Sequence, residues 1–160
     1  MVISEDLVWN VLNEIVDPEI PVVSLVEMGI IRGVEIQGER VIVTMTPTFS
    51  GCPALKVMEE DIYTKLGGIG IENVEVLSTF DPPWTSDWIK PEARRKIKNI
   101  GLAPPKVHGG DFSILLVESV TCPFCDSENT TLKNSFGSTP CRMIYYCNNC
   151  QQPFEQFKPL

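Results

Sequence analysis

Two pairs of cysteines near the end of the chain constrain its fold more than any other feature. The pairs read CPFC, at Cys122 and Cys125, and CNNC, at Cys147 and Cys150. Each CxxC turn presents two thiolates, and two such turns can close a tetrahedron around one metal ion. The sequence therefore predicts a four-cysteine zinc ribbon over residues 119–160. Iron uses the same ligands and stays open as an alternative occupant.

The size of this segment favours a bound metal over free thiols. From Cys122 to Leu160 there are 39 residues, and a domain of about 40 residues usually needs a metal or disulfides to fold. A structural zinc ion supplies apparent stabilisation of about 10–16 kcal/mol. A redox-active pair or buried free cysteines are the weaker alternatives. Short strands are expected in NTTLKNSF (129–136), RMIYY (142–146) and PFEQF (153–157).

Composition narrows the class of protein. Six cysteines in a chain that begins without a signal-peptide pattern favour metal sites or reactive thiols over disulfides. The net charge of −8 argues against a nucleic-acid partner, which needs clustered basic residues. No apolar run approaches the ~20 residues that cross a bilayer. We therefore expect a cytoplasmic protein with no membrane partner.

The composition changes sharply at GLAPPKVHGGD, where prolines and glycines interrupt the pattern of regular elements. We place a domain boundary there and expect three parts: residues 1–104 as the first domain, 105–118 as a linker, and 119–160 as the ribbon. Cys141 lies in the ribbon but outside both CxxC pairs, and we expect it to be a buried structural residue.

The first domain alternates helical and strand patterns. Ser4 can cap a helix whose apolar residues continue to Ile15, and Gly38 suits a hairpin turn. The expected elements are a helix from Ser4, strands at 29–36 and 40–46, a helix at 53–66, a strand at 73–80, and a helix from Ser86 or Lys90 to Gly101. The predicted fold class is α+β: an αββαβα sheet-and-helix domain followed by an all-β zinc ribbon.

The first cysteine, Cys52, stands alone in TPTFSGCPAL at the expected start of a helix. A thiol in that position ionises more readily, and Gly51 leaves room for a metal or a partner. A reactive thiolate and a small buried residue are equal alternatives here. A protease-type nucleophile would need a histidine, and the single histidine, His108, lies in the expected linker. Iron–sulfur clusters usually take four thiolates, so Cys52 could hold one only in a shared or transient way.

Several longer stretches resemble known families. DPEIPVVSLVEMGIIRGVEI, TPTFSGCPAL and FDPPWTSDWI resemble the SufT-like iron–sulfur assembly factors. Together with FGSTPC and the two CxxC pairs, nearly the whole chain resembles the PaaD family. Members of that family are accessory subunits encoded with the phenylacetyl-CoA epoxidase of phenylacetate catabolism.

This resemblance implies an accessory subunit with no activity of its own, which assists iron–sulfur cluster assembly or insertion in the reductase component. The implied partners are the components of the epoxidase complex. The resemblance also implies that Cys52 is the cluster-handling thiol, and that Asp17, Glu19 and Asp81 lie on the same face. For these acids, turn formation beside proline stays open as the alternative.

Other functions stay open at this stage. The chain could be a purely structural docking subunit, a thiol enzyme such as a CoA thioesterase, or a ribbon that binds nucleic acid. The near-neutral ribbon favours contact with a protein, for which Phe154 and Phe157 are the expected exposed aromatic residues. The client protein and a homodimeric state stay open as well.

Overall fold

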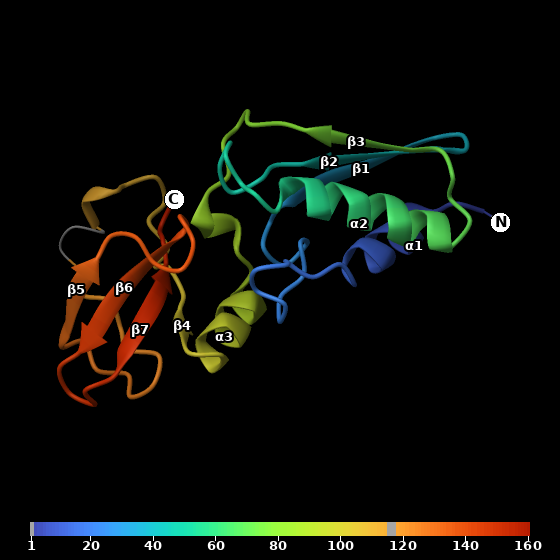
Figure 1. Ribbon diagram of the computed structural model, residues 1–160. Coiled ribbons are helices and arrows are strands. Elements are labelled where there is room, and N and C mark those ends of the chain that lie inside the picture. The colour runs from blue at the N-terminus through green and yellow to red at the C-terminus, as the bar shows by residue number, and fades with distance from the viewer. Residues whose placement is uncertain (1, 115–117) are drawn as a thin grey trace. The chain divides into compact units, whose positions relative to one another are not determined.

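The computed structural model describes residues 2–114 and 118–160, which form two compact units (Figure 1). The first unit ends at Trp84 and the second begins at Thr85. The division falls earlier than the expected boundary at residue 104. The helix α3 (Pro91–Asn99) and the short strand β4 (Leu102–Ala103) belong to the second unit, because β4 pairs in parallel with a strand of the ribbon.

The first unit is a three-stranded sheet covered by two helices. Its elements are α1 (Glu5–Leu12), β1 (Ile31–Gln37), β2 (Arg40–Met45), α2 (Leu55–Gly68) and β3 (Val74–Ser78). The strand order is β1-β2-β3, with β1 antiparallel and β3 parallel to β2. Figure 1 shows both helices on one face of the sheet. With α3, the predicted αββαβα order is confirmed.

Local sequence explains the limits of both helices. The Ser4 hydroxyl accepts a hydrogen bond from the Leu7 N–H at 3.3 Å and so caps α1 as predicted. The helix ends at Leu12, and Ile15 is buried in the turn that follows. The helix α2 continues to Gly68, beyond its expected end, and the chain takes a left-handed conformation only at Gly70, with φ of 88°.

The core of the first unit lies between the sheet and its helices. Alternate residues of β2 are fully buried, as a strand with one covered face requires: Val41, Val43 and Met45. Successive turns of α2 supply the buried residues Met58, Ile62 and Leu66. Side chains four positions apart lie on one face of a helix, so this row forms the apolar stripe of α2.

Side-chain hydrogen bonds shape the loop between α1 and β1. The Ser24 N–H donates to the Glu27 carboxylate at 2.9 Å, and the Glu27 N–H donates to the Ser24 hydroxyl at 3.0 Å. This reciprocal pair is a capping box. Nearer the helix, one Asp17 carboxylate oxygen accepts the N–H groups of Glu19 and Ile20 at 2.8 and 3.1 Å. The loop is thus held by its own polar side chains.

The second unit is built on a four-stranded sheet of order β4-β7-β6-β5. The ribbon strands are β5 (Thr130–Asn134), β6 (Arg142–Cys147) and β7 (Pro153–Phe157), which agrees with the three expected strands. Because β7 lies between β4 and β6, Phe154 and Phe157 are buried, and the expectation that they are exposed is wrong. A 3₁₀ turn (Ser86–Trp88) precedes α3, whose first residue is Pro91.

Part of the expected linker is packed into the second unit. His108 is only 4% exposed. Its Nε2 lies 3.1 Å from the Leu160 carbonyl oxygen, and its backbone N–H donates to an Asp87 carboxylate oxygen at 3.0 Å. These contacts join the segment around His108 to both ends of the unit. None of the helices in the described part of the chain is long and apolar enough to span a membrane.

Candidate metal centre and thiol site

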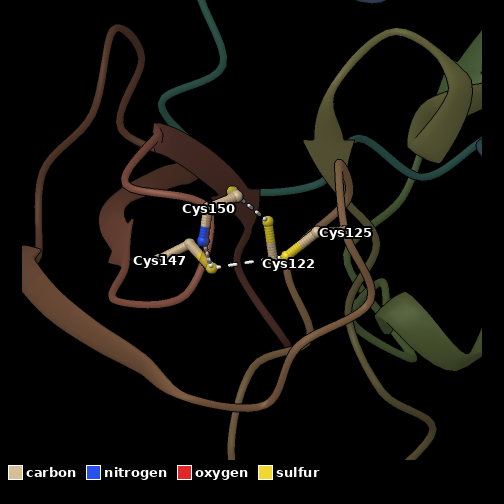
Figure 2. A group of neighbouring side chains, drawn as sticks. All are labelled: Cys122, Cys125, Cys147 and Cys150. Atoms are coloured by element: carbon tan, nitrogen blue, oxygen red, sulfur yellow. Dashed lines mark hydrogen bonds between the residues drawn. The ribbon is translucent and has the colours of Figure 1, made fainter.

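Two tight turns bring the four predicted cysteines together. The first turn, Cys122 to Cys125, precedes β5, and the second, Cys147 to Cys150, connects β6 to β7. The Sγ atoms of Cys122 and Cys150 lie 3.7 Å apart, and those of Cys125 and Cys147 lie 3.6 Å apart. All four sulfurs lie within 4.8 Å of one another. Figure 2 shows the side chains converging from the two turns.

The two turns have the same backbone hydrogen bonds. In the first, the Asp126 N–H donates to the Cys122 carbonyl at 3.0 Å, and the Cys122 N–H donates to the Ser127 carbonyl at 2.9 Å. The second turn repeats both bonds at 2.9 Å, from Gln151 to Cys147 and from Cys147 to Gln152. The same local fold therefore presents each pair of sulfurs.

Each turn closes on a residue in the left-handed conformation. Asp126 and Gln151, the residues that follow the second cysteine of each pair, both have φ of 60°. An L-residue other than glycine pays roughly 1–2 kcal/mol in this region. Both turns keep it, so the conformation belongs to the sulfur-presenting geometry.

The sulfur geometry fits one tetrahedral ion. Four thiolates about 2.3 Å from a central ion would lie about 3.8 Å from one another, close to the 3.6 and 3.7 Å between the paired sulfurs. Backbone N–H groups of Phe124 and Cys150 point at the sulfurs of Cys122 and Cys147, at 3.4 and 3.5 Å. Such donors stabilise thiolates. The cluster can therefore hold a metal ion.

Without an ion, the four thiols differ in proton affinity. The Ser127 N–H and the Asn149 amide lower the pKa of Cys125 to about 6. Burial and the neighbouring thiols raise the pKa of Cys150 to about 12. A metal ion must therefore displace protons at neutral pH when it enters the cluster.

The cluster is part of the core of the second unit. Cys122 and Cys147 are fully buried and pack with Ala103 and Phe154. Cys141 is also buried but lies outside the cluster, with its sulfur 3.0 Å from the Thr139 hydroxyl. An ion bound by the four cysteines would therefore bind in the interior of this unit.

Cys52 is half-buried in the loop between β2 and α2. Its N–H donates to the Phe49 carbonyl, and its own carbonyl accepts from the Leu55 N–H, both at 3.2 Å. The helix begins at Leu55 with Ala54 as its N-cap. The thiol thus lies just ahead of the helix and keeps part of its surface open to solvent.

The expectation that Cys52 is a readily ionised thiolate is wrong. Burial raises the pKa of Cys52, and the carboxylates of Glu19 and Asp17 raise it further. The backbone N–H groups of Ala54 and Leu55 lower the pKa, as expected at a helix start, but they do not outweigh the other effects. The free thiol therefore keeps its proton at neutral pH.

The topology of the sheet explains why Asp17 and Glu19 act on Cys52. Ile31 at the start of β1 and Ser78 at the end of β3 both pair with Met45 at the end of β2. The loop before β1 and the loops after β2 and β3 therefore leave the sheet at one edge. These loops carry the predicted group of Asp17, Glu19, Cys52 and Asp81.

The acids of this edge also have structural roles. Asp17 accepts two backbone N–H groups, so turn formation, the alternative role, does occur. The Asp81 N–H and carbonyl both bond to the Thr79 hydroxyl at 3.2 Å in an exposed turn. That turn leads to Trp84, whose Nε1 donates to the buried Met28 carbonyl at 3.0 Å. Trp84 thus ties two of the three loops together.

Thr46, the first residue after β2 at this edge, was not singled out by the sequence. Its side chain is 1% exposed, and its hydroxyl has no hydrogen-bond partner among the described residues. Threonine at the end of a strand is common. No sequence pattern distinguishes this hydroxyl from a paired one.

Family comparisons match both halves of the chain. The family described as "Iron-sulfur cluster assembly protein" matches residues 5–78, and the family described as "PaaD zinc beta ribbon domain" matches residues 112–158. A 1,2-phenylacetyl-CoA epoxidase subunit of Escherichia coli (strain K12) is 40% identical over 151 residues. The match covers 94% of this chain and 90% of that protein. The chain belongs to the PaaD family.

The first unit of this PaaD-family chain has relatives that lack a ribbon match. An Fe-S protein maturation auxiliary factor of Porphyromonas gingivalis (strain ATCC BAA-308 / W83) is 37% identical over 56% of the chain and 86% of its own length. A solved conserved hypothetical protein from Thermotoga maritima is 34% identical, with a TM-score of 0.52, over 59% of this chain and 94% of its own. These similarities agree with the predicted α+β fold.

The PaaD-family matches leave the middle of the chain unassigned. Residues 79–111 lie between the two matched ranges. They include Asp81, Trp84 and α3. Cys52 lies in the first matched range, and the four clustered cysteines lie in the second.

Proposed function

We propose that this PaaD-family chain is a cytoplasmic accessory subunit of a phenylacetyl-CoA epoxidase system in phenylacetate catabolism. In this role it assists iron–sulfur cluster assembly or insertion in the reductase component and has no catalytic activity of its own. One observation carries the proposal. A single chain joins an iron–sulfur assembly domain that carries one thiol to a PaaD ribbon, and over 94% of its length it is 40% identical to a phenylacetyl-CoA epoxidase subunit.

Cys52 is the proposed thiol that holds the cargo, an iron ion or an iron–sulfur cluster. The other five cysteines come after residue 120, so the first unit offers one thiolate. One thiolate holds a cluster weakly, because a stable site usually takes four. Further ligands would come from a client protein or a small thiol. Such a site can pass its cargo on.

The raised pKa of Cys52 supports this transient role. When iron binds, the thiol gives up its proton, and when iron leaves for the client, the sulfur takes a proton back. The carboxylates of Glu19 and Asp17 favour the protonated form and so favour release. Asp81, on the third loop of the same edge, is the remaining proposed supporting acid. The part-exposed thiol leaves a path for the cargo.

The ribbon is proposed to hold one zinc ion through Cys122, Cys125, Cys147 and Cys150. The sulfur distances and the four-cysteine donor set support this assignment, and iron is the alternative metal. Zinc would supply folding energy rather than reaction chemistry. The exposed rings of Phe124 and Phe136, 55% and 69% exposed, support a docking role toward the reductase.

The other candidate functions have less support. A thiol enzyme would need a free base, but both ring nitrogens of His108 are engaged in the described structure. Nδ1 accepts the Gly110 N–H at 3.0 Å, and Nε2 lies 3.1 Å from the Leu160 carbonyl oxygen. A purely structural docking subunit would not require a part-exposed Cys52. The following experiment separates that alternative from cluster handling.

The test is to replace Cys52 and measure iron–sulfur cluster occupancy in the reductase. Cys52→Ser is co-expressed with the epoxidase components, and iron and acid-labile sulfide are measured in the purified reductase. We expect occupancy to fall with Cys52→Ser and to stay at the wild-type level with Cys141→Ala, which removes a buried thiol outside both sites. Wild-type occupancy with Cys52→Ser would leave only the docking role.

A further inference from the structure

A cavity of about 320 Å³ lies within the second unit. Its walls include Pro104, Pro105, Val120 and Pro123, and the side chain of Gln156 from β7 lines it. Small-molecule sites typically enclose about 300–1,000 Å³ between mainly apolar walls. Among the described residues that line it there is no cysteine, so the cavity is separate from the metal centre.

The cavity exists because β4 ends early. Ala103 pairs with Gln156, and the next two residues, Pro104 and Pro105, have no N–H group with which to extend the ladder. The chain therefore leaves β7 at this point. The Arg94 guanidinium donates to the Pro105 carbonyl and to two further carbonyl oxygens of the same unit. These bonds hold the proline wall in place.

The polar group of the cavity is the side-chain amide of Gln156. The residue is 4% exposed, and its Oε1 has no hydrogen-bond partner among the described residues. A buried acceptor without a donor destabilises the folded state. A ligand that places an N–H group in the cavity would supply the missing donor.

Two lysines add positive charge to the same cavity. Lys98 and Lys106 line it, and they form ion pairs with Asp126 and Glu118. All four of these side chains are at least 36% exposed, and exposed ion pairs contribute little to stability. A ligand carboxylate can therefore recruit either ammonium group at small cost.

We propose that the Gln156 cavity binds a small molecule that combines an amide N–H, an apolar group and a carboxylate. The N–H donates to Gln156 Oε1, the apolar group contacts the proline wall, and the carboxylate lies beside Lys98 and Lys106. N-acylated amino acids have this combination of groups. The inference uses residues of the second unit only and does not depend on cluster handling by Cys52.

The test is titration of N-acetyl-L-leucine into the full chain, followed by amide NMR shifts and calorimetry. We expect saturable binding with shifts at Ala103, Val120 and Gln156. Two matched probes each remove one group: N-acetyl-L-leucinamide removes the charge, and N-acetyl-N-methyl-L-leucine removes the N–H. Each should bind about tenfold more weakly. No saturable shift with N-acetyl-L-leucine, or equal affinity for all three probes, would overturn the proposal.

Variants separate a ligand site from a structural glutamine. Gln156→Leu should weaken binding of N-acetyl-L-leucine about tenfold and leave Tm equal or higher, because it removes an unpaired buried acceptor. If this variant does not fold, the pair Lys98→Met and Lys106→Met tests the charge, with Lys90→Met as the control outside the cavity. We expect the pair to weaken binding and Lys90→Met to bind like the wild type. Wild-type affinity in Gln156→Leu, or in the lysine pair, would contradict the proposal.

Discussion

The sulfur atoms of Cys122 and Cys150 lie 3.7 Å apart, although the two residues are 28 positions apart in the chain. They belong to different turns, and Cys122 also packs in the buried cluster with Ala103 and Phe154. Contact between the turns therefore joins the beginning of the ribbon to its last strand. An ion at this point would stabilise the second unit as a whole, and not the two turns alone.

Removal of the metal should unfold the second unit and leave the first one folded. Structural zinc sites contribute about 10 kcal/mol or more, and a core built around the cluster cannot replace that contribution. The measurement is circular dichroism during thermal unfolding, with and without a strong chelator. We expect the chelator to abolish one of two transitions. The control is Cys141→Ala, which should keep one equivalent of metal, whereas an unchanged melting curve with chelator would contradict the prediction.

Glycine should stabilise the second cysteine turn at position 151. Gln151 has φ of 60°, a region that costs a non-glycine residue roughly 1–2 kcal/mol, part of which is offset by the greater flexibility of unfolded glycine. We expect Gln151→Gly to raise the stability of the metal-loaded protein by about 0.5–1 kcal/mol. The measurement is denaturant unfolding. The neighbouring Gln152→Gly, which lacks a positive φ, should be neutral or destabilising, and equal effects of both variants would contradict this account.

Alkylation of Cys52 should be slow at neutral pH and should speed up as the pH rises. Its pKa is raised, and the thiolate is the form that reacts, so the rate should increase about tenfold per pH unit below the pKa. Glu19→Gln removes a negative neighbour, lowers the pKa, and should increase the rate at a fixed pH.

The measurement for Cys52 is iodoacetamide labelling of the metal-loaded protein, read at this residue by peptide mass spectrometry. The control is Glu14→Gln, since Glu14 is an exposed residue that pairs with Lys65. That variant should label at the wild-type rate. A slower rate in Glu19→Gln would show that the carboxylate does not act on the thiol.

The bond from Trp84 to Met28 should be worth more than its length alone suggests. Trp84 is 5% exposed, and replacement by Phe would leave the Met28 carbonyl without its donor at 3.0 Å. A buried unsatisfied group costs about 1–3 kcal/mol. We expect Trp84→Phe to lower the stability of the first unit by that amount in denaturant unfolding. Trp88→Phe, at a less buried position in the second unit, should leave this transition in place.

The sequence by itself determined the features that depend on neighbouring residues. The spacing of Cys122, Cys125, Cys147 and Cys150 was enough to predict the cluster, because each CxxC turn is a local structure. Ser4 and the alternating apolar residues likewise predicted the first helix and the strands. These signals lie within a few positions of one another, so they survive without knowledge of the fold.

Only the tertiary structure decided the features that depend on distant residues. The helix start predicted an ionised Cys52, but Glu19 and Asp17, more than thirty positions away in the chain, raise its pKa. The two-residue strand β4 has no pattern of its own, yet its pairing with β7 moves the division between the units and buries Phe154. Burial and charge are set by whichever parts of the chain meet in space, and no local pattern contains that information.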